Sequence, residues 1–170
     1  MFIYSVRAST VRFFTVIVLV LVLLAVAVGI GSGDTVYASG NAEGVNFSGM
    51  KTNEDRVAFI ERFGINVADE PKEEKSFNMP ENFDRVILGY NELQREQGLD
   101  LSKYTKKKVT RYTYSLAEDG MEGVCVNLLV YRSKVIACDV SRGGEDGFVM
   151  GLVGLNKAEL LAKCDRNKTE

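Results

Sequence analysis

An uncharged apolar run near the start of the chain constrains this sequence more than any other feature. It covers 18 residues, Phe13 to Ile30, of which 14 are Phe, Ile, Leu or Val, and it follows Arg7 and Arg12. An α-helix rises about 1.5 Å per residue, so the run would span roughly 27 Å, close to the hydrocarbon thickness of a bilayer. The run therefore predicts a transmembrane helix over 13–30 that contacts membrane lipid.

The basic residues around the run predict its orientation. Arg7 and Arg12 precede it, whereas the Gly-rich stretch 31–50 that follows contains no Lys or Arg. Positive side chains favour the cytoplasmic side of a membrane. We therefore expect a single-pass protein of the cytoplasmic membrane, with an N-terminus over 1–12 inside the cell. The stretch 31–50 would be a flexible linker to a domain outside the cytoplasm.

A cleaved signal peptide is the alternative to a membrane anchor. Val36-Tyr37-Ala38 has the small-x-small pattern of a cleavage site, and cleavage near Ala38 would release a secreted protein. The apolar run is longer than the usual hydrophobic part of a signal peptide, which favours the anchor. A buried helix of a soluble protein is a third interpretation. The anchor and the signal peptide both export the same domain.

The composition of the exported part argues against several functions. It contains 19 of the 21 basic residues and all 23 acidic ones, a formal charge of −4, which argues against nucleic-acid binding. The chain has no His, and therefore neither Ser–His nor Cys–His catalytic pairs nor the commonest metal ligand. We identify no catalytic, cofactor-binding or metal-binding residues in the sequence and expect no cofactor.

The pattern of apolar residues predicts two helices followed by strands. Helices are expected over 53–63 and 81–97 because apolar residues recur there at helical spacing. The apolar stripe of the second helix consists of Phe83, Val86, Ile87, Tyr90 and Leu93. Extended segments are expected over 65–68, 73–79, 108–116, 124–131 and 134–140, a turn of helix over 99–104, and a strand or a helix over 148–155.

These elements predict an α+β domain over 51–155, in which two helices pack on one face of a small antiparallel sheet. Arg132-Ser133 has the length of a two-residue hairpin loop, although neither residue is the Gly or Asn that eases a positive φ. A polar tail is expected over 156–170, with a short helix around Leu160-Leu161.

Five stretches of the exported part resemble a known bacterial family. They are TNEDRVAFIERFG (52–64), DRVILGYNELQREQGLDLSKY (84–104), KKVTRYTYSL (107–116), NLLVYRSKVIACDV (127–140) and DGFVMGL (146–152). In order and spacing they are similar to the domain of unknown function 4830 family of clostridial-type, Gram-positive bacteria. The resemblance implies a bacterial exported domain behind an N-terminal membrane segment, and it implies no activity.

Three cysteines are the first candidates for chemistry: Cys125, Cys138 and Cys164. An odd number outside the cytoplasm leaves at least one thiol free or paired with another chain. If the predicted hairpin loop is correct, Cys125 faces Val140 and Cys138 faces Asn127, so the two thiols share a sheet face diagonally. Buried free thiols, a disulfide after a register shift and a functional pair all stay open. We expect Cys164 to be more exposed and able to bridge to another chain.

Two groups of charged residues are further candidates. The basic run comprises Lys103, Lys106, Lys107, Lys108 and Arg111, beside Tyr104, Tyr112 and Tyr114. It would bind an anionic wall polymer or lipid headgroups, or it would protect a sheet edge against pairing. The acidic group comprises Glu118, Asp119, Asp139, Glu145 and Asp146. It would ligate a cation only if its loops converge, and solvated loops are the alternative.

The predicted function is a non-catalytic binding or envelope-associated module, with an envelope protein or an anionic wall polymer as partner. Export and the lack of recognisable catalytic motifs support it. A carboxylate-based cell-wall hydrolase is the alternative, and it would need two acidic side chains about 5–9.5 Å apart in one cleft. A structural or sensory subunit of an envelope complex is the third hypothesis.

Overall fold

The structure is a computed structural model that describes residues 44–165. The predicted membrane segment at 13–30, the N-terminus at 1–12 and most of the predicted linker at 31–50 lie outside these residues. Within 44–165, no helix is long and apolar enough to cross a membrane.

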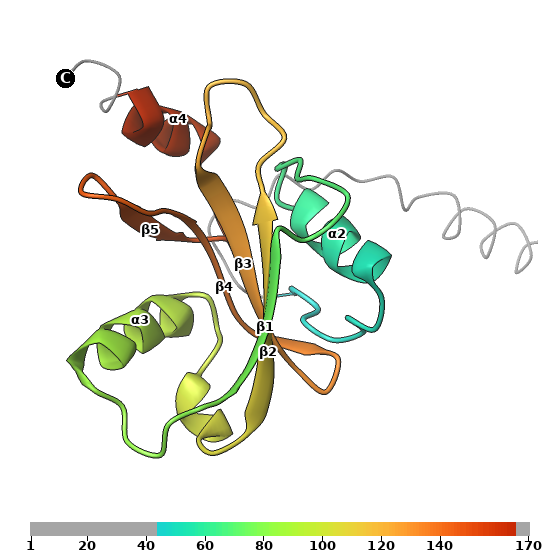
Figure 1. The fold of residues 1–170 in the computed structure, drawn as a ribbon, viewed down its shortest axis with the longest axis vertical. Helices are drawn as coiled ribbons and strands as arrows, with labels where there is room; N and C mark the ends of the chain where they lie inside the picture. Colours follow the sequence, from blue (N-terminus) through green and yellow to red (C-terminus); the bar gives the residue numbers. More distant parts are fainter. Residues whose placement is uncertain (1–43, 166–170) are drawn as a thin grey trace, which may run out of the picture. The chain divides into compact units, whose positions relative to one another are not determined.

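The described residues form an α+β domain, as predicted. Its elements are α2 (Asn53–Glu61), β1 (Glu73–Asn78), α3 (Arg85–Glu96), η1 (Leu101–Tyr104), β2 (Lys108–Ser115), β3 (Val124–Tyr131), β4 (Lys134–Arg142), β5 (Phe148–Gly151) and α4 (Lys157–Asp165). The five strands form one antiparallel sheet in the order β1-β2-β3-β4-β5 (Figure 1). The segment 148–155 is thus a strand at its start, and the short strand expected at 65–68 is reduced to a single bridge between Val67 and Leu116.

Side-chain caps determine where the first two helices begin. The Thr52 side chain accepts a hydrogen bond from Asp55 N, and the Asp55 carboxylate accepts one from Thr52 N, which completes the predicted capping box of α2. The Asp84 side chain accepts from Ile87 N at 2.9 Å and caps α3. Because Asp84 is the cap, α3 begins four residues later than the predicted Glu81.

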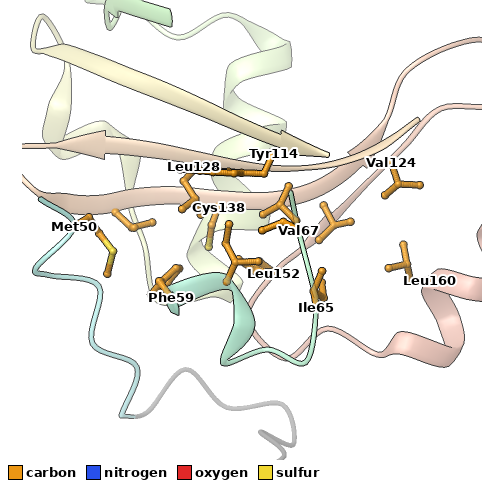
Figure 2. Packing of buried hydrophobic residues seen from close by; sticks show 14 of the residues in the cluster. Met50, Phe59, Ile65, Val67, Tyr114, Val124, Leu128, Cys138, Leu152 and Leu160 are labelled. Carbon is orange, nitrogen blue, oxygen red and sulfur yellow. The ribbon is translucent and has the colours of Figure 1, made fainter. Parts of the chain in front are cut away.

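One face of the sheet carries the larger of two apolar cores. Alternate side chains of a strand point to opposite faces, so Tyr114, Val126 and Leu128 all lie on this face. They are fully buried beneath α2 and α4, which contribute Phe59, Ile60, Leu160 and Cys164. Figure 2 shows Leu128 and Tyr114 at the sheet, facing the side on which Phe59 and Leu160 lie.

The opposite face carries a second, smaller core covered by α3 and η1. Its buried members are Met79, Leu101, Val109, Leu129, Ile136 and Ala137. Tyr90 of α3 packs against this cluster, and Figure 1 shows α2 and α3 on opposite sides of the sheet. The prediction that two helices share one face is therefore wrong. Val109 and Leu129 make the second face apolar as well, and such a face must also be covered.

The β3–β4 hairpin has the predicted loop but not the predicted register along its whole length. Arg132 and Ser133 have φ of 46° and 60°, as a two-residue type I′ turn requires. A register shift between Leu129 and Val130 then places Cys138 opposite Leu128 instead of Asn127. A shift of one residue moves a side chain to the other face. Cys125 and Cys138 thus lie on opposite faces, and the expectation of a shared face is wrong.

The end of the predicted linker lies against the domain. The backbone nitrogens of Gly49 and Met50 donate to Ser133 O at 2.9 and 3.0 Å, and Val135 N donates to Phe47 O at 2.8 Å. The side chain of Met50 is 5% exposed and belongs to the larger core. The packed part of the chain therefore includes residues 47–50.

The predicted short helix of the C-terminal tail is α4, and it packs on the larger core. Leu160 and Cys164, four residues apart, lie on the same face of this helix, and both are fully buried. The expectation that Cys164 is exposed is therefore wrong.

Candidate binding site

The fully buried residues of helix α3 are polar, whereas the apolar stripe that its sequence carries is only partly buried, and Val86 is exposed. Asn91 and Gln94 are its buried residues, and Gln97 just beyond it is 3% exposed. In contrast, Val86 is 79% exposed and Leu88 is 50% exposed. The prediction that the stripe is the packed face is wrong for Val86, and the rotation of the helix needs another explanation.

Hydrogen bonds to the backbone of β4 explain this rotation. Cys138 N donates to Gln94 Oε1 at 2.9 Å, and Gln97 Nε2 donates to Cys138 O at 3.0 Å. β5 pairs with β4 only from Asp139 onward, so these backbone groups have no partner strand on that side. A buried backbone group without a partner costs about 1–3 kcal/mol. The two glutamines replace the missing strand and fix the side of α3 that faces the sheet.

Asn91 adds a second polar attachment, between α3 and η1. Its Oδ1 accepts from Leu101 N at 2.7 Å, and its Nδ2 donates to Asp100 Oδ1 at 3.2 Å. Asp100 also accepts two hydrogen bonds from Ser102, whose side chain is the main reason that the pKa of Asp100 falls to about 2. Hydrogen bonds therefore fix the position of α3 against the sheet and also against η1.

The rotation leaves a pocket of about 360 Å³ between the first half of α3 and the second face of the sheet. Its apolar lining residues are Phe77, Val86, Ile87, Leu129 and Val149. Its polar lining residues are Tyr90, Arg111, Asn127 and Asp139. Every strand contributes at least one of these residues. A volume of this size and an apolar lining with a few convergent polar groups are typical of small-ligand sites.

Asp139 is the most buried polar group of this pocket, with 4% of its surface exposed. Its Oδ1 accepts from the Tyr90 hydroxyl at 2.6 Å, and its Oδ2 accepts from Asn127 Nδ2 at 2.8 Å. Thr113 Oγ1 donates to Asn127 Oδ1 at 2.8 Å and extends the network to β2. Thr113, Asn127 and Asp139 lie directly opposite one another across three strands. The register shift between Leu129 and Val130, a β-bulge, creates this row, because without it Cys138 would stand opposite Asn127.

Burial determines the electrostatics of the network. Removal from water raises the pKa of Asp139, although the hydrogen bonds from Tyr90 and Asn127 oppose this effect. Burial, and then the neighbouring Asp139 carboxylate, raise the pKa of Tyr90 well above its usual value, so its hydroxyl keeps its proton and donates. Within residues 44–165, Asp139 forms no salt bridge.

Arg111 is the basic residue of the pocket, and another acid already holds it. Its Nη2 lies 2.9 Å from Glu73 Oε2 on the edge strand β1. Its Nε is buried without a hydrogen-bond partner among the described residues. The guanidinium thus keeps one free donor at the pocket while its charge is paired with Glu73.

The three cysteines are all free thiols. Cys138 and Cys164 are buried, as the interpretation of buried free thiols requires, and Cys125 is half-buried. Burial raises the pKa of the Cys138 thiol, which keeps it protonated. The structure does not bring these sulfur atoms together into a disulfide.

The basic run does not form one surface. Lys106 Nζ lies 2.5 Å from Glu81 Oε1, and Arg111 pairs with Glu73. Lys108 and Arg111 belong to β2, which has a partner strand on each side, so edge protection by these two residues is wrong. The edge strands of this sheet are β1 and β5.

The acidic group is also divided. Asp139 lies in the pocket, whereas Glu118 Oε2 pairs with Lys157 Nζ at 2.8 Å. Glu145 and Asp146 lie in the exposed loop between β4 and β5. Among residues 44–165, no three Cys, Asp or Glu side chains lie close enough together to hold a metal ion.

The sequence patterns did not identify the pocket as a set of residues. Asp139 and Arg111 were candidates only within groups that the structure separates, and Asn127 was not a candidate site residue. A signal was present, because Asn127 and Asp139 are polar residues within the apolar strands 124–131 and 134–140. Such residues in a buried strand need partners, and that need could have linked them.

These elements define a small α+β domain with an apolar pocket over a buried carboxylate network. Residues 59–137 match a family described as "Domain of unknown function (DUF4830)". This part of the chain is therefore similar to that family, in agreement with the sequence resemblance. The match includes Tyr90, Arg111 and Asn127 of the pocket and ends before Asp139. No curated protein and no solved structure matches the chain.

Proposed function

We propose that this protein is a membrane-anchored, non-catalytic binding module that takes a small ligand in the pocket beneath α3. The observation that carries this proposal is the pocket itself, in which apolar walls surround the buried Asp139 network. In a domain of unknown function, a pocket with these properties is the first place where a binding site is expected. Two exposed apolar residues at the pocket, Val86 and Val149, would become covered when a ligand binds.

The place of the domain in the cell is part of the same proposal. The apolar run 13–30 would anchor the chain in the cytoplasmic membrane with residues 1–12 inside, and the domain would face the envelope. Cleavage near Ala38 would instead release it. The ligand would then come from the envelope or from outside the cell, which fits an envelope component better than a cytoplasmic metabolite.

The arrangement of acidic side chains favours binding over hydrolysis. Asp139 is the one acidic residue that lines the pocket beneath α3. A second, shallower pocket of about 280 Å³ is lined by Glu96 and Glu159, but both residues are exposed. A glycosidase needs one carboxyl group whose pKa is raised by burial, close to a second carboxylate. Neither pocket combines these two properties.

Membrane placement can be tested with the full-length chain in a Gram-positive host. We expect the protein in the membrane fraction until detergent is added. We also expect proteases added to cells without a wall to digest the domain. Recovery in the soluble fraction, or protection from those proteases, would contradict the anchored orientation.

Ligand binding can be tested with methyl NMR of the full-length chain in detergent and a library of small fragments. Signals from Ile87, Leu129 and Val149 should shift with the bound fragments. Val86→Arg would put a charge at the pocket and should abolish the shifts, whereas Leu161→Arg, an equally drastic change on exposed α4, should leave them unchanged. Equal responses of the two variants, or no shifts at all, would contradict the proposed pocket.

A further inference from the structure

The buried carboxylate of Asp139 has unused hydrogen-bonding capacity in the pocket. An ionised carboxylate offers about four lone-pair sites. Tyr90 and Asn127 donate to one oxygen each, the Ser141 hydroxyl also stabilises the carboxylate, and all three groups are neutral. Hydrogen bonds from neutral groups leave the negative charge itself uncompensated, and burying such a charge is costly without a cation beside it.

Arg111 supplies that cation only in part, since its charge lowers the pKa of Asp139 but is shared with another acid. Its Nη2 pairs with Glu73, and its side chain is 40% exposed. It stands opposite Leu129 in the sheet, whereas Asp139 stands opposite Asn127, one row further along. Asp139, Arg111 and Glu73 together carry one net negative charge, so the charge that complements this site is positive.

The walls around Asp139 determine the rest of the ligand. Phe77, Ile87 and Leu129 give the pocket an apolar lining, and Val86 and Val149 are exposed beside it. An apolar stem would cover these side chains, and each buried methylene contributes about 0.8 kcal/mol. The volume of about 360 Å³ has room for such a stem together with its ammonium group.

We propose that this pocket binds a primary ammonium group on a short apolar stem, with the Asp139 carboxylate as its counter-charge. The inference rests on the proposed function and specifies its ligand. An uncharged apolar ligand would bury Asp139 further without compensation, and a carboxylate would be repelled by it. A free alkylamine and a lysine side chain both carry this chemistry.

The test uses three probes of equal length, namely butylammonium, 1-butanol and butyrate, with methyl NMR of the full-length chain in detergent. Butylammonium should shift the signals of Ile87, Leu129 and Val149 in a saturable manner. Asp139→Asn should weaken this binding by about tenfold or more, because it removes the charge and keeps the shape. Asp119→Asn, the same change at an exposed acid outside the pocket, should have no effect.

A second variant separates charge from hydrogen bonding. Tyr90→Phe removes the hydroxyl that donates to Asp139 and leaves the carboxylate in place, so it should weaken butylammonium binding less than Asp139→Asn does. Unchanged methyl signals from the larger core would show that both variants fold. Comparison of blocked lysine amide with butylammonium then distinguishes the sources, since tighter binding of the lysine compound indicates a peptide side chain. Blocked norleucine amide, which lacks the ammonium group, is the control for charge.

The outcomes separate the inference from the function on which it rests. Equal binding of 1-butanol and butylammonium, unaffected by Asp139→Asn, would leave a binding pocket but overturn the ammonium ligand. Preferential binding of butyrate, lost in Arg111→Gln, would overturn it in favour of an anion site. Absence of shifts with every probe and with the fragment library would overturn both proposals.

Discussion

The two faces of the sheet are held to their helices by different forces. The face beneath α2 and α4 belongs to a cluster of 18 buried apolar residues, whereas the cluster beneath α3 has 6. Helix α2 buries Phe59 and Ile60 together with one polar residue, Arg56, whereas the buried residues of α3, Asn91 and Gln94, are both polar. Apolar packing fills the space between its partners, whereas hydrogen bonds hold partners at a few points and can leave space between them. The first face is therefore the structural core, and the second can contain a binding pocket.

The largest test of this comparison uses two adjacent leucines that point to opposite faces. Leu128 is fully buried in the larger core, and Leu129 is 7% exposed and lines the pocket. We expect Leu128→Ala to lower the free energy of unfolding by about 3–4 kcal/mol, since it leaves a closed cavity. Leu129→Ala should cost about 2 kcal/mol, because its cavity opens into the pocket. Urea unfolding of both variants measures the difference.

The urea experiment has an internal control. The slope of the unfolding free energy against urea concentration should stay the same in both variants, because the surface exposed on unfolding barely changes. Equal losses of stability at the two positions would show that the faces are packed to the same density. The distinction between a structural face and a binding face would then fail.

The polar attachment of α3 gives the next largest effect. Gln97→Ala would leave Cys138 O and Val153 N without their side-chain partner. We expect the free energy of unfolding to fall by about 2 kcal/mol, the cost of buried backbone groups without partners. Glu96→Ala, at the exposed neighbouring position, should change it by less than about 0.5 kcal/mol. If Gln97→Ala were as mild as its neighbour, apolar contacts and not these hydrogen bonds would hold α3.

Two carboxyl groups near α3 predict opposite dependences of stability on pH. Burial raises the pKa of Asp139, so the folded chain loses this proton at a higher pH than the unfolded chain, which loses it near about pH 4. The stability that Asp139 contributes, relative to Asp139→Asn, should therefore fall as pH rises. The hydrogen bonds from Ser102 lower the pKa of Asp100 to about 2, so its contribution should be complete above about pH 4 and be lost toward about pH 2.

Urea unfolding of the wild type, Asp139→Asn and Asp100→Asn from acid to neutral pH checks both signs. The difference between the wild type and Asp139→Asn should shrink or reverse as pH rises. The difference between the wild type and Asp100→Asn should grow over the same range and then become constant. Parallel curves for the two variants would mean that Asp139 is as well solvated as Asp100, and the pocket would not be a low-dielectric site.

The sequence predicted those parts of the fold that local patterns specify. Thr52 and Asp55 identify the start of α2, and alternating apolar residues identify β3 and β4. The rotation of α3 could not be predicted in this way. Its apolar stripe indicates the centre of the packed face, but the backbone of Cys138 requires hydrogen-bond partners and turns the helix toward two glutamines that are 41 and 44 positions away. Such a requirement exists only after the sheet has formed.

The candidate site was harder to predict than the fold, because it depends on one bulge. Counting from the hairpin loop alone places Cys138 opposite Asn127. The register shift between Leu129 and Val130 places Asp139 there instead and so creates the carboxylate network. A bulge of this kind has no local signal in this sequence, since Ile136 and Ala137 are ordinary strand residues. Without the extra residue of this bulge, Cys138 would share a sheet face with Cys125. With it, Asp139 takes that place and is buried in the pocket.

The smallest expected effect concerns the hairpin turn that determines which side chains of β3 and β4 face α2 and which face the pocket. Ser133 has φ of 60°, a left-handed conformation that costs an L-residue about 1 kcal/mol. Ser133→Gly removes that strain but also gives the unfolded chain more freedom, so we expect a net stabilisation of about 0.5 kcal/mol in urea unfolding. Ser133→Ala should give no such gain, because it keeps the side chain that opposes this φ. If alanine stabilised the protein as much as glycine, the strain would not lie in the turn, and the hairpin would determine the two faces through its strand pairs alone.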